Sequence, residues 1–185
     1  MTDNWIALLR TAHTEFTARV AAVVDWEAPT PDTDWNVRDL VTHVTEDLQW
    51  VPELLAGRTT AEAKLAMAPL GDDLPAEWNR YSVAALEAWE SADLDARVHL
   101  SYDTVSASEY LAEQVGDITI HTWDLARATG TSEELDEDLV DAVWAVFEPQ
   151  AGQLEASGLY APAVAVPNDA PLRIRLLALT GRDAG

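Results

Sequence analysis

Apolar residues recur at helical spacing along most of this 185-residue chain, and this periodicity restricts the fold more than any other sequence feature. One short segment, 97–102, alternates apolar and polar residues, which is typical of an extended strand. We therefore expect an all-α protein, a four-helix bundle with short appended C-terminal elements. The apolar stripes predict helices at about 3–25, 36–57, 73–91 and 106–130, and a further helix that begins between 131 and 136 and ends at Pro149.

Local signals define several helix boundaries. Ser106 and Glu109 have the spacing of a capping box at the start of the fourth predicted helix, and Gly130 is expected to end that helix. Pro52 lies inside the second helical range, where it is expected to kink or break the helix. The connecting segment 58–71 is expected to hold a short helical piece. No linker composition separates these elements, so we expect residues 1–185 to form a single domain.

Composition excludes several classes of function. The chain has 11 Lys and Arg residues against 33 Asp and Glu residues, a formal net charge of -22, so its surface repels phosphate backbones and anionic lipid. We expect a small-molecule substrate and neither a nucleic-acid nor a membrane partner. The N-terminus has no secretory pattern and no run is long enough to cross a bilayer, so a cytoplasmic protein is expected. We also expect a monomer or homodimer.

Two of the predicted helices each carry a carboxylate and an imidazole four residues apart. His43 and Asp47 lie on the second helix, while Asp117 and His121, followed by Asp124, lie on the fourth. Both pairs are placed beside an apolar stripe rather than opposite it. The chain has no cysteine, so any metal must be held by nitrogen and oxygen ligands. The best three-point set for a divalent cation is His43, Asp117 and His121.

The same spacing is also compatible with an ordinary surface contact that binds no metal. A carboxylate and a histidine four residues apart on a helix often make only a surface hydrogen bond, so spacing alone leaves both interpretations open. His13 is expected on a polar face or in the core, and His99 on the extended segment, rather than as further ligands. Glu46 is a second candidate carboxylate on its helix, and Trp50 and Trp123 are candidates to wall a pocket.

Four segments of the chain resemble a known family, and they are 29–44 (PTPDTDWNVRDLVTHV), 51–58 (VPELLAGR), 117–128 (DITIHTWDLARA) and 175–182 (RLLALTGR). The resemblance is to the mycothiol-dependent maleylpyruvate isomerase N-terminal domain family within the DinB-like superfamily, and in particular to its single-domain, uncharacterised metal-binding branch. It implies an up-down-down-up four-helix bundle, with a metal triad of a histidine on the second helix and an acid-x-x-x-His pair on a later helix. Those positions are His43, Asp117 and His121 here.

The resemblance and the ligand set together predict a metal-dependent enzyme that acts on small molecules. Three protein ligands leave coordination positions open for water or substrate, which is typical of a catalytic metal. Zinc is expected first, with nickel or iron as alternatives. We expect the metal to activate the thiol of mycothiol or a related cofactor for transfer to, or isomerisation of, an electrophilic substrate. Because the chain has no cysteine, the cofactor must supply that thiol.

Two departures from the family pattern limit this expectation. Asp32 stands where relatives often have cysteine. The characterised isomerase also has a further C-terminal domain that supplies a catalytic arginine, and the short tail here does not replace a domain. We therefore do not expect maleylpyruvate isomerase activity itself.

Other functions and roles stay open from the sequence. One alternative is a non-catalytic metal- or ligand-binding module, and another is a thiol-independent, metal-dependent hydrolase or cyclase. Candidates to orient ligands or carry protons are Glu46, Asp47 and Asp124, and candidates to hold an anionic substrate are Arg58, Arg80 and Arg127.

Overall fold

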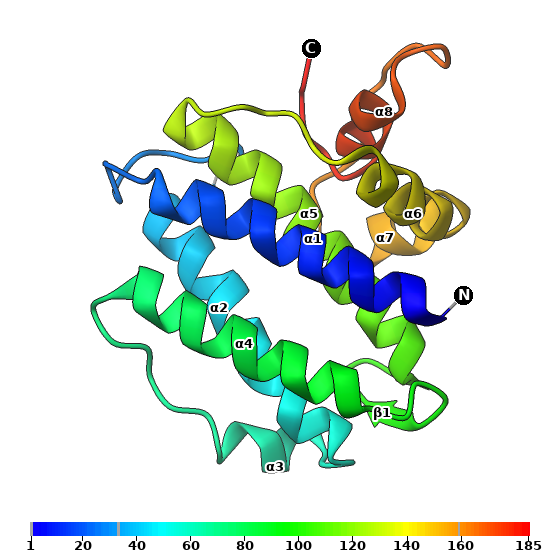
Figure 1. The fold of residues 1–185 in the computed structure, drawn as a ribbon. Helices are drawn as coiled ribbons and strands as arrows, with labels where there is room; N and C mark the ends of the chain where they lie inside the picture. Colours follow the sequence, from blue (N-terminus) through cyan, green and yellow to red (C-terminus); the bar gives the residue numbers. More distant parts are fainter. Residues whose placement is uncertain (1, 33, 159) are drawn as a thin grey trace.

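Four long helices form a bundle in the computed structural model, which describes residues 2–32, 34–158 and 160–185 (Figure 1). Helix α1 packs against α4 and α5, and α2 packs against the same two helices. The first and last helices of the bundle run in one direction and the middle two in the other. The predicted all-α, up-down-down-up bundle is confirmed. Its helices are α1 (Thr2–Ala21), α2 (Val37–Leu55), α4 (Leu74–Ser91) and α5 (Ala107–Thr129).

The connection between α2 and α4 follows from this topology. The two helices are parallel neighbours, so the chain must travel back along the bundle before α4 can begin. Residues 56–73 make this return, and they contain the short helix α3 (Thr60–Lys64), which confirms the helical piece expected there. A capping box between Thr59 and Glu62 starts α3.

Helix ends follow the local signals in the sequence, with one exception. Ser106 and Glu109 form the capping box of α5, and Gly130 ends the helix in the left-handed conformation with a φ of 66°. Of the kink or break expected at Pro52, the break is wrong, because α2 continues through Pro52 to Leu55. Pro52 lies in the last turn of the helix, where one missing N–H costs a single intrahelical hydrogen bond.

The elements outside the bundle are a hairpin and a C-terminal group of helices. The extended segment expected at 97–102 ends as a strand at His99, and the chain turns back into a second strand that was not predicted. Helix α6 packs on α5, and α8 packs on α6. Helix α6 ends at Phe147, two residues before the end expected at Pro149, and Pro149 itself lies in a 3-10 turn that leads to α7. The bounds are β1 (Arg97–His99), β2 (Thr104–Ser106), α6 (Glu137–Phe147), η1 (Glu148–Gln150), α7 (Ala151–Ser157) and α8 (Leu172–Leu179).

Large aromatic side chains fill the bundle interior. The rings of Phe16 and Trp78 pack with centroids 4.5 Å apart, and the Trp78 indole donates a hydrogen bond of 2.8 Å to the Thr17 hydroxyl. The Trp89 indole likewise donates to the Gln114 side-chain oxygen at 2.7 Å. These buried indoles therefore have partners for their N–H groups, and this part of the bundle is a packed core.

Within the described part of the chain, no helix combines the length and apolar character needed to cross a membrane.

His13 belongs to this core. It is 7% exposed and lies edge-on to Trp78, with ring centroids 5.4 Å apart. Its Nε2 atom has no hydrogen-bond partner among the described residues. Burial lowers the pKa of His13 to about 4, because the imidazolium form loses its hydration there. His13 is thus a buried neutral histidine in the core, which is one of the two positions that the sequence left open.

This histidine should make folding pH-dependent. In the unfolded chain His13 recovers a pKa of 6.5, so between pH 6.5 and 4 the unfolded state binds a proton that the native state does not. Stability present above pH 6.5 is therefore lost as the pH falls. Between pH 7 and 4, we expect wild type to lose about 3 kcal/mol more unfolding free energy than a His13→Leu variant. Urea denaturation across this range measures the difference, and parallel pH profiles would contradict it.

Candidate metal centre

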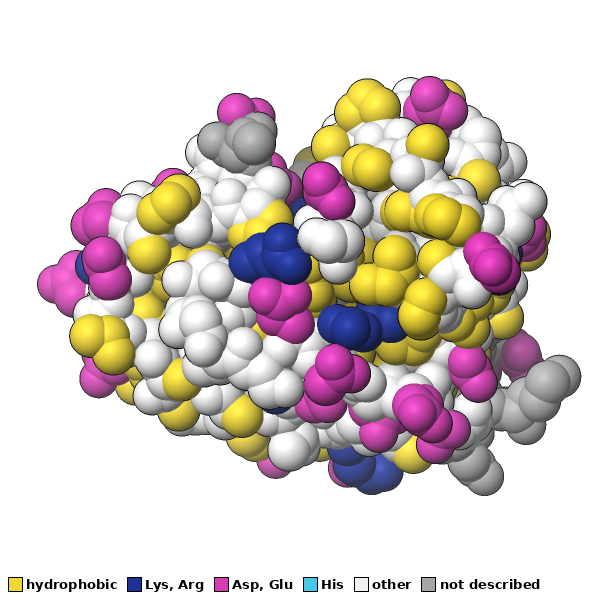
Figure 2. All heavy atoms as spheres, turned by 90° about the horizontal axis from the view of Figure 1, so that it is seen from above, with side chains coloured by type: hydrophobic (Ala, Val, Ile, Leu, Met, Phe, Trp, Pro, Cys, Tyr) yellow, Lys and Arg dark blue, Asp and Glu magenta, His cyan; other side chains and the backbone are white. Residues whose placement is uncertain are grey.

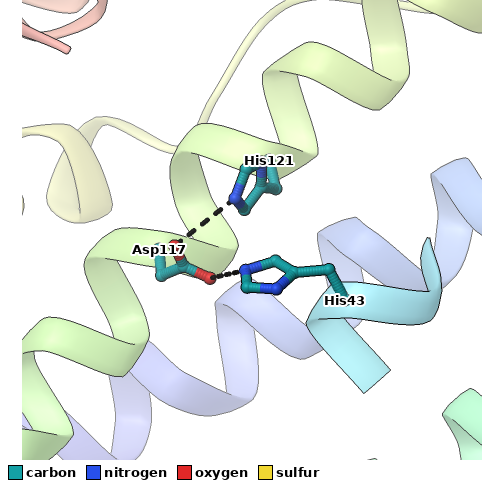
Figure 3. A group of neighbouring side chains, drawn as sticks. All are labelled: His43, Asp117 and His121. Atoms are coloured by element: carbon teal, nitrogen blue, oxygen red, sulfur yellow. Dashed lines mark ion pairs between the residues drawn. The ribbon is translucent and has the colours of Figure 1, made fainter. Parts of the chain in front are cut away.

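Helices α2 and α5 bring three potential ligands together where they pack. His43 comes from α2, and Asp117 and His121 come from successive turns of α5. The Asp117 carboxylate lies between the two imidazoles, 3.4 Å from His121 Nε2 and 3.9 Å from His43 Nε2 (Figure 3). Ligand atoms from all three residues lie within 4.8 Å of one another. Atoms that share one zinc ion lie about 3 to 4 Å apart, so small side-chain rotations would suffice to bring the three around an ion.

The three side chains differ in their access to solvent. The His121 side chain is only 4% exposed, whereas His43 is 33% exposed and Asp117 is 26% exposed. His121 is therefore fixed inside the protein, while the other two lie at an opening. A small molecule would approach the cluster from the side of His43 and Asp117.

A tryptophan that the sequence analysis did not single out packs on both imidazoles. The Trp35 ring centroid lies 4.5 Å from that of His43 and 5.7 Å from that of His121. The Thr30 side chain and backbone N–H both donate hydrogen bonds to the Trp35 carbonyl, which closes the loop before α2. Trp35 lies within the resembling segment 29–44, and that was the signal that could have identified it.

A buried carboxylate fixes the orientation of His121. Asp124 is fully buried, and its Oδ2 lies 3.1 Å from His121 Nδ1. A carboxylate can only accept a hydrogen bond, so Nδ1 must carry the proton and Nε2 is directed towards Asp117 and His43. This arrangement of a carboxylate behind a histidine is common where the histidine binds a metal through its other nitrogen.

Arg182 completes this group from the far end of the chain. Its Nε and Nη2 atoms donate to the two Asp124 carboxylate oxygens at 3.1 and 2.7 Å. Its Nη2 also lies 3.5 Å from Asp32 Oδ2. Sequence reasoning missed Arg182 as a site residue, because 58 positions separate it from Asp124. The only available signal was its place at the end of the resembling segment 175–182.

In this group of side chains, attraction between opposite charges changes the pKa values more than burial does. Burial disfavours the imidazolium of His121, but Asp117 and Asp124 raise the pKa of His121 to about 10. Burial alone would raise the pKa of Asp117 and of Asp124, but the neighbouring His121 holds both pKa values below their usual range. Asp124 raises the pKa of Arg182 in spite of burial. Without a ligand the carboxylates are anionic and His121 is cationic at neutral pH, so a cation that binds Nε2 must displace a proton.

A further carboxylate lies beside His43. Asp47 Oδ2 is 3.5 Å from His43 Nε2, and the Asp47 side chain is 46% exposed. Partial burial raises the pKa of Asp47 to about 6, against the attraction of His43. Glu46, the alternative carboxylate on this helix, is exposed. The structure therefore places Asp47 at the solvent side of the cluster.

The other candidate residues lie elsewhere. His99 is exposed on the hairpin and contacts Thr104, and Trp123 is fully buried beneath the Arg127 guanidinium. Trp50 is half-buried and packs against the core. Each arginine considered for an anionic substrate is exposed and pairs with a glutamate: Arg58 with Glu53, Arg80 with Glu77, and Arg127 with Glu133.

Comparison with known proteins identifies the family. Residues 9–126 match the family model described as Mycothiol maleylpyruvate isomerase N-terminal domain, and the chain belongs to this family. The matched region contains His43, Asp117 and His121 but ends well before Arg182.

Two relatives and one solved structure illustrate the similarity. The uncharacterized proteins MT0763 and Rv0738, from the CDC 1551 / Oshkosh and ATCC 25618 / H37Rv strains of Mycobacterium tuberculosis, are each 27% identical over 157 residues, which cover 83% of both chains. A crystal structure of a histidine-to-alanine mutant of the mycothiol-dependent maleylpyruvate isomerase is 18% identical. It has a TM-score of 0.63, and the match covers 83% of this chain and 69% of that chain. At this identity the likeness concerns the fold alone.

The buried ion pair yields a stability prediction. Replacing Arg182 with Met leaves Asp124 as a buried carboxylate that keeps only the His121 imidazolium as a charged partner, and we expect the free energy of unfolding to fall by about 3 kcal/mol. Arg127→Met is the matched control, because Arg127 makes a similarly bidentate pair with Glu133, with both N–O distances 3.0 Å, at the surface. The control should lose about 1 kcal/mol or less. Denaturation of both variants at pH 7 measures this, and equal losses would refute a special role for burial.

Proposed function

We propose that the protein binds a divalent metal ion through His43, Asp117 and His121 and acts with a low-molecular-weight thiol cofactor of the mycothiol type. The reaction is the transfer or isomerisation of an electrophilic small molecule. The observation that carries the proposal is the cluster of two imidazoles and one carboxylate, half open to solvent, in a member of a family named for mycothiol. Zinc is the first candidate because imidazole and carboxylate ligands suit it, and nickel and iron are alternatives.

The donor set fits such an ion. His121 offers Nε2 because Asp124 holds Nδ1, and Asp117 offers a carboxylate between the two imidazoles. When bound, a metal of this kind stabilises the thiolate form of a coordinated thiol near neutral pH. Three protein ligands leave a position for such a thiol, and the partial exposure of His43 and Asp117 provides access to it.

The residues around the cluster have separate roles. Trp35 packs on both imidazoles and restricts their movement from that side. Asp47 Oδ2 lies beside His43 on the solvent side, where it can accept the proton of an arriving thiol. The chain contributes no thiol of its own, since it has no cysteine. The thiol chemistry therefore depends on the cofactor.

The surface supports a small-molecule substrate over a polyanionic partner. Acidic side chains are scattered over the face shown in Figure 2, where basic side chains are few. The formal net charge of -22 opposes binding to nucleic acid and to anionic lipid. We place the protein in the cytoplasm, as a monomer or homodimer.

Elemental analysis after zinc loading and desalting tests the metal part of the proposal. We expect about one zinc per wild-type chain, and a loss of at least ten-fold in zinc affinity in His121→Ala because a ligand is removed. His99→Ala is the matched control, since His99 is an exposed histidine on the hairpin, and it should retain wild-type binding. Equal, substoichiometric zinc in all three proteins would rule out the site.

A cobalt-substituted sample tests the thiol part. Mycothiol added to the cobalt(II) protein should produce a sulfur-to-metal charge-transfer band in the near ultraviolet, and this band should be absent from His121→Ala. Metal binding without such a band would leave a metal-binding protein that does not use this thiol.

A further inference from the structure

The C-terminal segment carries a buried arginine into the bundle. Arg182 is 4% exposed, and its guanidinium makes a bidentate pair with Asp124, a hydrogen bond of 2.6 Å to the Thr180 carbonyl and a longer contact with Asp32. The Tyr160 ring lies 5.7 Å from the guanidinium carbon. These protein groups occupy the guanidinium, so it is not free to bind a substrate. Its role must be exerted through the residues that it holds.

The end of α8 directs this side chain inward. The Arg182 N–H donates to the Leu177 carbonyl at 2.9 Å, and the Gly181 N–H donates to the Ala178 carbonyl at 3.1 Å, which is the hydrogen-bond pattern of a Schellman motif. Gly181 has a φ of 82°, and a Cβ there would lie 2.6 Å from the Ala161 side chain and 2.7 Å from its carbonyl oxygen. Glycine is therefore required at 181, and the backbone just before Arg182 has little freedom.

We infer that Arg182 is a positioning residue for the metal ligand His121 and that it acts through Asp124. The inference rests on the proposed function, because it takes His121 as a ligand. The planar guanidinium engages both Asp124 oxygens, so the carboxylate cannot rotate, and Oδ2 stays 3.1 Å from His121 Nδ1. The imidazole is then held with Nε2 towards Asp117. A lysine would hold only one point of the carboxylate.

The contact between Arg182 and Asp124 defines a role for the C-terminal elements. The family match ends at residue 126, and Arg182 lies in the segment that follows α8, which packs on α6 rather than on the bundle's metal cluster. The C-terminal elements thus complete the metal centre by contributing one side chain. The hydrogen bonds and ion pairs of Arg182 go to Asp124, Asp32 and the Thr180 carbonyl rather than to the three proposed ligands, and its side chain is buried, which distinguishes it from a catalytic residue.

Cobalt(II) affinity and the cobalt absorption spectrum test this inference. Arg182→Lys keeps the charge but loses the bidentate contact, and we expect it to bind cobalt about 10-fold more weakly. The double variant Asp124→Asn/Arg182→Met removes both charges of the Asp124–Arg182 pair, so it avoids the under-compensated buried carboxylate that destabilises Arg182→Met. It retains an amide oxygen for His121, and we expect 10- to 100-fold weaker binding and a shifted visible spectrum.

Arg175→Met is the matched control. Arg175 lies on α8 and stacks on Trp144 at 4.5 Å, so its loss should leave cobalt affinity and spectrum unchanged. Circular dichroism and thermal melting of the metal-free proteins identify the folded variants, and Arg182→Lys decides the matter if the double variant does not fold.

The outcomes separate this inference from the proposed function. Wild-type cobalt affinity and spectrum in the folded Arg182 variants would overturn the positioning role and leave the metal site intact. A wild-type protein that binds no cobalt or zinc would overturn the proposed function, and the inference with it. Weaker binding in the Arg182 variants, with normal binding in Arg175→Met, would support both.

Discussion

The buried carboxylate of Asp124 is the constraint on which the candidate site depends. A fully buried carboxylate is tolerated only when charged or hydrogen-bonding partners surround it, and Arg182 and His121 supply both. The requirement links two distant parts of the chain, because Arg182 must reach the bundle from the segment after α8. It also determines which nitrogen of His121 is available to a ligand. One electrostatic requirement therefore couples the fold of the C-terminal segment to the chemistry of the centre.

The packed aromatic core and the ionised groups occupy different parts of the bundle. Trp78 and Trp89 use their indole N–H groups within the core, and His13 is held there as a neutral ring. The ionised groups gather instead between α2 and α5, where His43 and Asp117 are partly exposed. The packed core supports the two helices that carry the cluster, while His43 and Asp117 at its edge remain partly exposed. This division suits a site that must be both fixed and open.

Local patterns predicted the helices and selected the three clustered residues, because both depend on short-range spacing. Asp117 and His121 are four apart on one helix, and this places them on the same face whatever the rest of the fold does. His43 joined them because it also lay beside an apolar stripe. Arg182 and Trp35 were missed because long-range packing, rather than periodicity, brings them to the site. Strand β2 was missed because it is short and its last residue, Ser106, already carries the stronger signal of a helix cap.

The absence of cysteine constrains the chemistry of the candidate site. It restricts the cluster to nitrogen and oxygen ligands, and it assigns any thiol to a cofactor. Anomalous diffraction at the zinc edge, from crystals grown with zinc, tests the central claim most directly. The account predicts one strong peak bounded by His43, Asp117 and His121 Nε2. A peak at surface carboxylates alone, with none between α2 and α5, would contradict it.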